Sequence, residues 1–199
     1  MPVRFKLDVD KTVAAIVFLA ASGTRDLTKY KIVKLLFLAD KHHLVRYGRT
    51  VTGDRICAMD YGPVPSVALD ALNVFLGADR ANSEAREIAK QLSQYIVVDD
   101  RYRNKHFNAF RTCDYNRSLS PSDLGALEAV VKEHGAKSFE ELKAMTHELF
   151  AYRKAWGDRS GDNPPMNFED LFVEDPDAIE GAFEEMIENY ELARGKPAV

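Results

Sequence analysis

The sequence predicts a mainly helical (α+β) protein: a multi-helix domain around a buried central helix at about residues 28–47, with a small antiparallel β-hairpin. The first observation is that residues 32–39 are apolar apart from Lys34, and a helix that is apolar nearly all round is buried among other elements. The second is that several other segments repeat apolar residues at helical spacing. The third is that strand-forming residues gather only in short stretches, which predicts small strands and no large sheet.

The central helix has well-marked ends. Thr28 is a residue type that accepts hydrogen bonds from the first backbone N–H groups of a helix, so the helix is expected to begin after it. Gly48 stands where a left-handed residue commonly ends a helix. Lys41 and Arg46 lie in the last turns, where the helix dipole favours positive charge.

Capping signals and periodic apolar residues predict the other helices. Ser120 followed by Pro121 is a cap with proline at the first helical position, and Ser138 with Glu141 has the pattern of a capping box. The predicted helices outside the central one cover residues 10–22, 66–76, 82–94, 120–133, 138–149, 152–156, 168–172 and 176–194.

Two regions predict short strands. Residues 49–59 carry β-branched side chains and predict a strand or hairpin around a turn at Gly53-Asp54. Residues 60–65 contain two prolines and predict an extended turn, because the residue before a proline is disfavoured in the helical region. Residues 95–98 and 105–113 alternate in polarity and predict a second antiparallel pair.

Length and composition predict one domain spanning residues 1–199, since 199 residues at 46% hydrophobic content suffice for a real core. No run of apolar residues is long enough for a membrane span, and the early apolar run lacks the basic flank of a signal peptide. Cys57 and Cys113 lie far apart without metal-site spacing, so neither a disulfide framework nor a zinc ribbon is expected. We therefore expect a cytoplasmic protein.

The charge is divided unevenly along the chain. Residues 1–112 carry 18 Lys and Arg against 12 Asp and Glu, whereas residues 113–199 carry 9 against 19. Residues 162–191 contain eleven acidic side chains and no Lys or Arg. This acidic end disfavours nucleic acid as its partner, and solvated helices explain it better than a basic partner does.

The search for catalytic chemistry finds no nucleophile elbow, phosphate loop, dinucleotide fingerprint, zinc-protease motif or calcium loop. Asp40, His43 and Tyr47 share one face of the central helix and, with Tyr61, could form an enzyme site. A structural hydrogen-bond set explains these residues better. We therefore expect no catalytic residue, no metal and no cofactor.

A basic and aromatic segment at residues 101–107 could contact single-stranded nucleic acid, because such binding combines positive charge with stacking rings. A hairpin with a solvated tip is the interpretation we favour. A nucleic-acid-binding regulator is further disfavoured by the isoelectric point near 5.8 and by the lack of a recognisable helix-turn-helix.

Several separated motifs are similar to those of one known family. The matching residues are Lys34-Leu35-Leu36, Ala39-Asp40, Tyr47-Gly48, Thr52-Gly53, Tyr61-Gly62-Pro63-Val64, residues 119–135, Thr146-His147 and Trp156. In order and spacing they resemble the Panacea (SocA-like) antitoxin domain, a phage-associated family, over residues 11–157. The acidic helical extension at residues 166–194 lies outside the resemblance.

The resemblance implies an antitoxin: a non-enzymatic binding module that neutralises a cognate protein toxin encoded nearby by direct protein-protein contact. In some family members the toxin is also handed to a protease, so a protease adaptor is an alternative. The family pairs with many unrelated toxins, and the resemblance therefore names no particular partner.

The candidate toxin-binding residues are the polar and aromatic side chains that interrupt the apolar pattern of the matching segment, because such groups are costly near a core unless paired or exposed at a functional surface. They are Lys34, Asp40, Tyr47, Thr52, Asp60 and Tyr61. Tyr61 is the strongest candidate, since the Gly62-Pro63 turn fixes the backbone after it and tyrosine is favoured in binding hot spots. The alternative is that all six only brace the fold.

Overall fold

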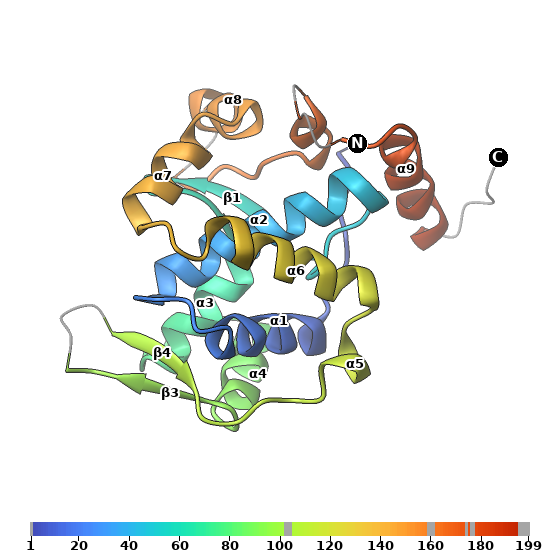
Figure 1. Ribbon diagram of the computed structural model, residues 1–199. Coiled ribbons are helices and arrows are strands. Elements are labelled where there is room, and N and C mark those ends of the chain that lie inside the picture. Colours follow the sequence, from blue (N-terminus) through green and yellow to red (C-terminus); the bar gives the residue numbers. More distant parts are fainter. Residues whose placement is uncertain (1, 102–104, 159–161, 174, 176–177, 195–199) are drawn as a thin grey trace.

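A computed structural model describes residues 2–101, 105–158, 162–173, 175 and 178–194, and it is mostly helical with two small antiparallel strand pairs (Figure 1). This confirms the predicted fold class. The helices are α1 (Val9–Ala21), α2 (Lys29–Tyr47), α3 (Ser66–Phe75), α4 (Ser83–Leu92), α5 (Tyr115–Ser118), α6 (Pro121–His134), α7 (Phe139–His147), α8 (Phe150–Asp158), the 3₁₀ helix η1 (Phe168–Phe172) and α9 (Ala182–Ala193).

Helix α2 is the centre of the molecule, as predicted. It crosses the middle of the fold and contacts α1, α3, α6, α7 and α9 (Figure 1). The side chains of Ile32, Leu35, Leu36 and Leu38 are all buried. The helix begins after Thr28, whose hydroxyl accepts a hydrogen bond from the Lys31 N–H, and ends at a left-handed Gly48.

The first strand pair differs from the prediction in where the chain turns. Strands β1 (Ile56–Met59) and β2 (Gly62–Pro65) pair with Met59 opposite Gly62, so the hairpin turn is at residues 60–61 and not at Gly53-Asp54. The Asp54 carboxylate instead accepts hydrogen bonds from the N–H groups of Val67 and Ala68, at 3.2 and 2.8 Å, and caps the start of α3. Capping from a distant loop is a tertiary contact that local turn signals do not reveal.

Gly53 has a left-handed conformation and lies where two segments of the chain cross. A Cβ atom there would lie 2.1 Å from the backbone oxygen of Lys6, and the N–H of Asp8 donates to the Thr52 carbonyl nearby. The N-terminal segment therefore passes directly over this glycine. The space that a hairpin partner would need is already occupied by another segment.

The second pair is β3 (Ile96–Asp99) with β4 (His106–Ala109), close to the predicted strands at residues 95–98 but shorter than the predicted strand at 105–113. Beyond Ala109 the regular pairing ends, and the N–H groups of Phe110 and Arg111 both donate to the Tyr95 carbonyl, at 3.0 and 3.4 Å. Helix α4 beside this pair buries Ile88 and Leu92 in the core.

The last helix is shorter than the predicted helix at residues 176–194. Residues 176–177 lie outside the described part, and α9 starts only after a left-handed Gly181. The N–H of Ile179 donates to the Val45 carbonyl at 2.9 Å, so the chain before α9 is tied to the end of α2. Met186 is buried against α2, whereas Ile179 and Phe183 of the predicted apolar stripe are exposed.

Candidate functional site

The motif residues that are far apart in the sequence meet at the β1–β2 turn. Gly62 adopts φ +92°, a conformation that disfavours residues with a Cβ atom. A Cβ atom at Gly62 would lie 2.8 Å from Lys34 Nζ and 3.0 Å from both Thr146 Oγ1 and His147 Cδ2. The turn therefore closes tightly on α2 from one side and α7 from the other, and only glycine fits without a shift of these neighbours.

Lys34 fixes this turn from inside the protein. Its side chain is 1% exposed, and Nζ donates a hydrogen bond to the Pro63 carbonyl at 2.7 Å. Burial, together with the nearby positive charge of Lys143, lowers the pKa of Lys34 to about 7. A lysine held in this way positions the turn rather than meeting a partner directly.

Aromatic side chains from three elements gather on the outer surface of the same turn. Tyr61 is 51% exposed and Tyr30 40%, and each ring lies near the ring of Phe139, with centroid distances of 6.1 and 5.8 Å. The two tyrosine rings are 5.9 Å apart. We call Tyr30, Tyr61 and Phe139 the aromatic cluster. Exposed rings at fixed positions are typical of protein-binding hot spots.

Two lysines cover the faces of these rings. The Nζ of Lys143 lies 5.1 Å from the centroid of Tyr61, and that of Lys29 lies 4.9 Å from the centroid of Tyr30. Such cation–π contacts contribute about 0.5–1 kcal/mol at exposed sites and favour one ring orientation. The surface around the aromatic cluster is therefore positively charged as well as apolar.

A stack of rings supports the other side of the turn. His147 packs on Tyr152 at 4.5 Å between ring centroids, and Tyr152 lies parallel to Trp156 at 6.0 Å. The Tyr152 hydroxyl donates to the Met59 carbonyl at 2.9 Å, which ties α8 to β1. Burial, followed by the charges of Lys34 and Lys143, lowers the pKa of His147 and keeps its ring neutral near pH 7.

Asp40 and Thr52 form a separate buried pair. Thr52 donates to the Asp40 carboxylate through its N–H at 2.8 Å and through its hydroxyl at 2.6 Å. Burial raises the pKa of Asp40 to about 7, although the hydrogen bonds from Thr52 act in the opposite direction. The pair holds the chain after α2 against the middle of that helix.

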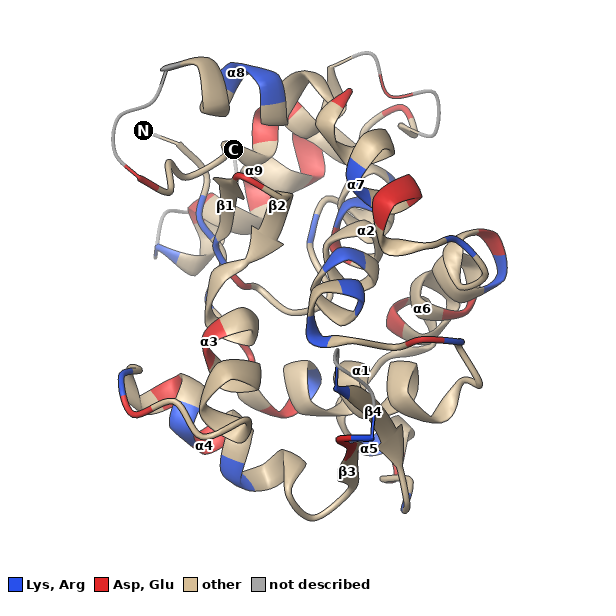
Figure 2. Cartoon of the chain, turned by 90° about the vertical axis from the view of Figure 1, so that its left-hand side faces the viewer, with Lys and Arg blue, Asp and Glu red and all other residues tan. Residues whose placement is uncertain are grey.

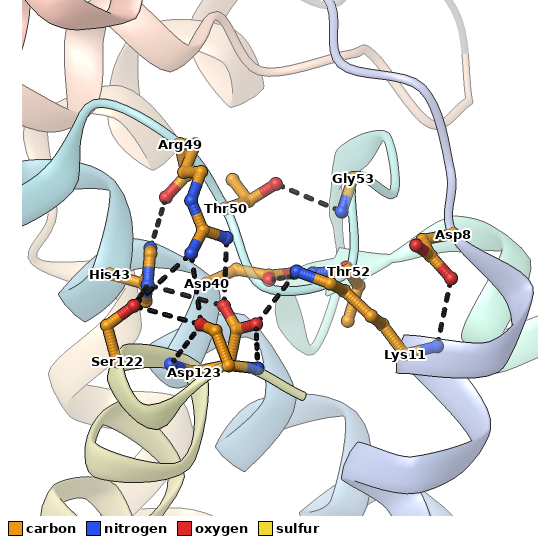
Figure 3. Close-up of polar contacts among 11 residues, drawn as sticks. Asp8, Lys11, Asp40, His43, Arg49, Thr50, Thr52, Gly53, Ser122 and Asp123 are labelled. Atoms are coloured by element: carbon orange, nitrogen blue, oxygen red, sulfur yellow. Dashed lines mark hydrogen bonds and ion pairs between the residues drawn. The ribbon is translucent and has the colours of Figure 1, made fainter. Parts of the chain in front are cut away.

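A second polar network lies nearby and is shown in Figure 3. Asp123 is fully buried and accepts hydrogen bonds from Lys11 at 2.7 Å and Arg49 at 2.9 Å. Burial tends to raise the pKa of Asp123, but hydrogen bonds from Lys11 and Ser120 and the charge of Arg49 outweigh it, and the pKa is lowered. This charged pairing links α1, α6 and the loop after α2.

His43 belongs to this network as a neutral ring. Its Nδ1 lies 2.7 Å from the Arg49 carbonyl, which can only accept, so Nδ1 carries the proton and Nε2 accepts from the Ser122 hydroxyl at 3.0 Å. Burial lowers the pKa of His43 to about 4, so its 3.3 Å contact with Asp123 is not an ion pair near pH 7. Asp40 bonds Thr52, His43 lies in the network around Asp123, and Tyr61 packs near Phe139. The three side chains therefore do not form one site.

The six candidate residues divide by burial. Lys34, Asp40 and Thr52 are buried, whereas Tyr47, Asp60 and Tyr61 are exposed. Tyr47 lies at the far end of α2, about 25 Å from Tyr30 at 1.5 Å per helical residue, and packs on His43 at 4.6 Å. The aromatic cluster therefore contains one of the six predicted residues.

Sequence reasoning missed Tyr30, Phe139, Lys143 and Asp123. Tyr30 and Phe139 each lie in the first turn of a helix, where a single aromatic residue outside the core carries no periodic signal. Asp123 closes a capping box with Ser120 at the start of α6, and its contacts with Lys11 and Arg49 are tertiary contacts without a local signal.

Within the described ranges, no group of three or more His, Cys, Asp or Glu side chains could hold a metal ion. The helices of those ranges include none with both the length and the apolar character required to cross a bilayer. The basic and aromatic segment at residues 101–107 lies partly outside the described residues, since residues 102–104 are not included.

Comparison with known proteins identifies one family. No curated protein and no solved structure matches the chain. The family described as antitoxin SocA-like, Panacea domain matches residues 32–151, which is more than half of the sequence and includes the turn, its buried lysine and the aromatic cluster apart from Tyr30. The chain belongs to the SocA-like antitoxin family with the Panacea domain.

Proposed function

We propose that the protein neutralises a cognate protein toxin, encoded nearby, by direct contact through the aromatic cluster. The observation that carries the proposal is the exposure of Tyr61, on a turn that the buried core fixes, beside the exposed ring of Tyr30 at the start of α2. Family membership supports a toxin–antitoxin role in general. In this proposal Tyr61 and the exposed Asp60 touch the toxin, and Lys34, Asp40 and Thr52 act by positioning the backbone.

The rigidity of the turn supports binding by this surface. Lys34 holds the Pro63 carbonyl, Tyr152 holds the Met59 carbonyl, and Gly62 leaves no free space against α7. A surface that is already ordered loses little conformational entropy when a partner binds, so more of the contact energy appears as affinity.

A binding role explains the polar residues better than an enzyme role does. The Asp40 carboxylate accepts both its hydrogen bonds from Thr52, and the Nδ1 and Nε2 atoms of His43 bond Arg49 and Ser122. Tyr61 belongs to another surface. We therefore propose that the module is non-enzymatic. We also propose that it acts in the cytoplasm. Delivery of the bound toxin to a protease would use the same contact.

The test is rescue of growth in cells that express the protein encoded by the adjacent gene. We expect Tyr61→Ala to lose rescue and to weaken binding of the purified partner by at least about 30-fold, the effect of a hot spot of ~2 kcal/mol. The matched control is Phe110→Ala, which removes a ring that is 61% exposed at the end of β4. It should rescue like wild type.

Melting temperatures of both variants decide between contact and bracing. Loss of rescue by Tyr61→Ala with an unchanged melting temperature supports a contact surface. Loss of rescue in proportion to lost stability supports a bracing role and contradicts the proposal, as does full rescue by Tyr61→Ala.

A further inference from the structure

A cleft of about 780 Å³ opens next to the aromatic cluster. It lies between the start of α2, the start of α7 and the beginning of β4, where the Phe107 N–H donates to the Leu27 carbonyl at 2.8 Å. Tyr30 and Phe139 line this cleft as well as forming the aromatic cluster. The two features are therefore parts of one continuous surface.

The lining of the cleft is strongly basic. Its cationic residues are Arg25, Lys29, Lys31, Lys105 and Lys137, and its acidic residues are Asp26 and Glu141. Figure 2 shows Lys and Arg along α2, beside α7. This excess of positive charge contrasts with the formal net charge of −4 for the whole chain.

The cations of the cleft differ in what they already bind. Lys31 donates to the carbonyls of Arg25 and Gly135, at 2.7 and 2.9 Å, and Lys29 donates to the side-chain oxygen of Asn73. The side chains of Arg25 and Lys105 are exposed, and within the described ranges no hydrogen bond or ion pair engages either of them. These two charges are available to an incoming anionic group.

We propose that the cleft binds an acidic segment of the partner toxin, whose apolar residues pack on the aromatic cluster while its carboxylates meet Arg25 and Lys105. This inference rests on the proposed function and adds the chemistry of the partner. Complementary charge beside an apolar contact sets the register and the association rate of a protein complex.

The extent of the basic surface favours a protein segment over nucleic acid. Binding along a phosphate backbone requires cations spread over a long track. Here five cations line one cleft, and acidic residues outnumber Lys and Arg in the rest of the chain, with α9 carrying Glu184, Glu185, Glu188 and Glu191. The charge of the cleft therefore fits a short acidic peptide.

The first test is binding of a fluorescein-labelled acidic peptide of about twelve residues, made of Glu with one central Trp, at low ionic strength. We expect Arg25→Glu/Lys105→Glu to weaken binding by at least about tenfold, because reversal replaces attraction by repulsion. The control Lys90→Glu/Lys132→Glu changes the net charge equally at residues of α4 and α6 that do not line the cleft, and it should bind like wild type. All substituted side chains are exposed, so the melting temperatures should match.

Three outcomes of this test overturn the inference. The first is no binding of the acidic peptide to wild type, and the second is an equal loss in the cleft and control variants. The third is displacement of the peptide by ATP or a single-stranded oligonucleotide at lower concentration than by unlabelled peptide, which would make the cleft a phosphate site.

Rescue of growth separates this inference from the proposed function. If wild type fails to rescue cells from the adjacent gene's product, the proposed function fails. If wild type rescues and Arg25→Glu/Lys105→Glu rescues equally well, the toxin contact remains and the acidic-segment inference alone fails. We expect rescue by wild type and by the control variant, and loss of rescue by the cleft variant.

Discussion

The Nζ atom of Lys34, in the second turn of α2, donates a 2.7 Å hydrogen bond to the Pro63 carbonyl in β2. An ammonium group buried in this way loses its hydration, and one hydrogen bond to a carbonyl does not replace it. The fold therefore accepts an energetic cost at neutral pH in order to hold the turn that carries Tyr61.

This cost predicts how stability changes with pH. The pKa of Lys34 is about 7 in the folded protein and near 10.5 when the chain is unfolded, so between these values the unfolded state binds more protons. The Lys34 contribution to the free energy of unfolding is smallest below pH 7 and increases as the pH rises toward 10.5. Urea unfolding should show a larger increase in wild type than in Lys34→Met, in which the lowered pKa of Lys31 still contributes. Lys90→Met, an exposed control, should behave like wild type, and an equal slope in all three proteins would contradict the prediction.

Gly62→Ala should destabilise the protein by ~1–3 kcal/mol, because alanine would be forced into a left-handed conformation against Lys34, Thr146 and His147. The matched control is Gly125→Ala inside α6, where a Cβ atom meets nothing within 4 Å. That change should stabilise the helix by ~0.5–1 kcal/mol. Thermal unfolding compares the two, and similar melting temperatures would show that the turn is not tightly packed.

Asp40→Asn should change both stability and its pH dependence. An amide cannot accept both hydrogen bonds from Thr52, so the variant should lose ~1–3 kcal/mol at acidic pH. In wild type the folded pKa of Asp40 is about 7, raised from 3.8, so its stabilising contribution is complete below pH 3.8 and is lost as the pH rises through 7. The difference between wild type and variant should therefore shrink from pH 4 to pH 7. Asp60→Asn, at an exposed position, should follow wild type throughout, and a difference that grows with pH would refute this account.

Asp123→Ala should cost ~3–5 kcal/mol, because it leaves Lys11, Arg49 and Ser120 without a shared buried acceptor. Glu141→Ala is a close control, since both acids close a capping box at the same position of their helices but Glu141 is exposed. It should cost only ~1 kcal/mol. Denaturant unfolding of both variants gives the comparison, and equal losses would mean that Asp123 contributes only as a cap.

The sequence by itself determined the central helix and the start of most of the others. The burial of Ile32, Leu35 and Leu36 follows from the lack of a polar face over two turns of α2. The starts of α2, α6 and α7 follow from side chains that bond backbone groups three residues away. These signals are local, so they act in the same way wherever the helix is placed.

Only the tertiary structure decided where the first hairpin turns and which residues make up the candidate site. Asp54 caps a helix that begins twelve residues later, and the N-terminal segment occupies the space over Gly53. Lys34, Gly62 and His147 meet because α2, the β1–β2 turn and α7 pack together. Contacts between residues distant in the chain depend on the shapes and packing of whole elements, which residue spacing does not encode.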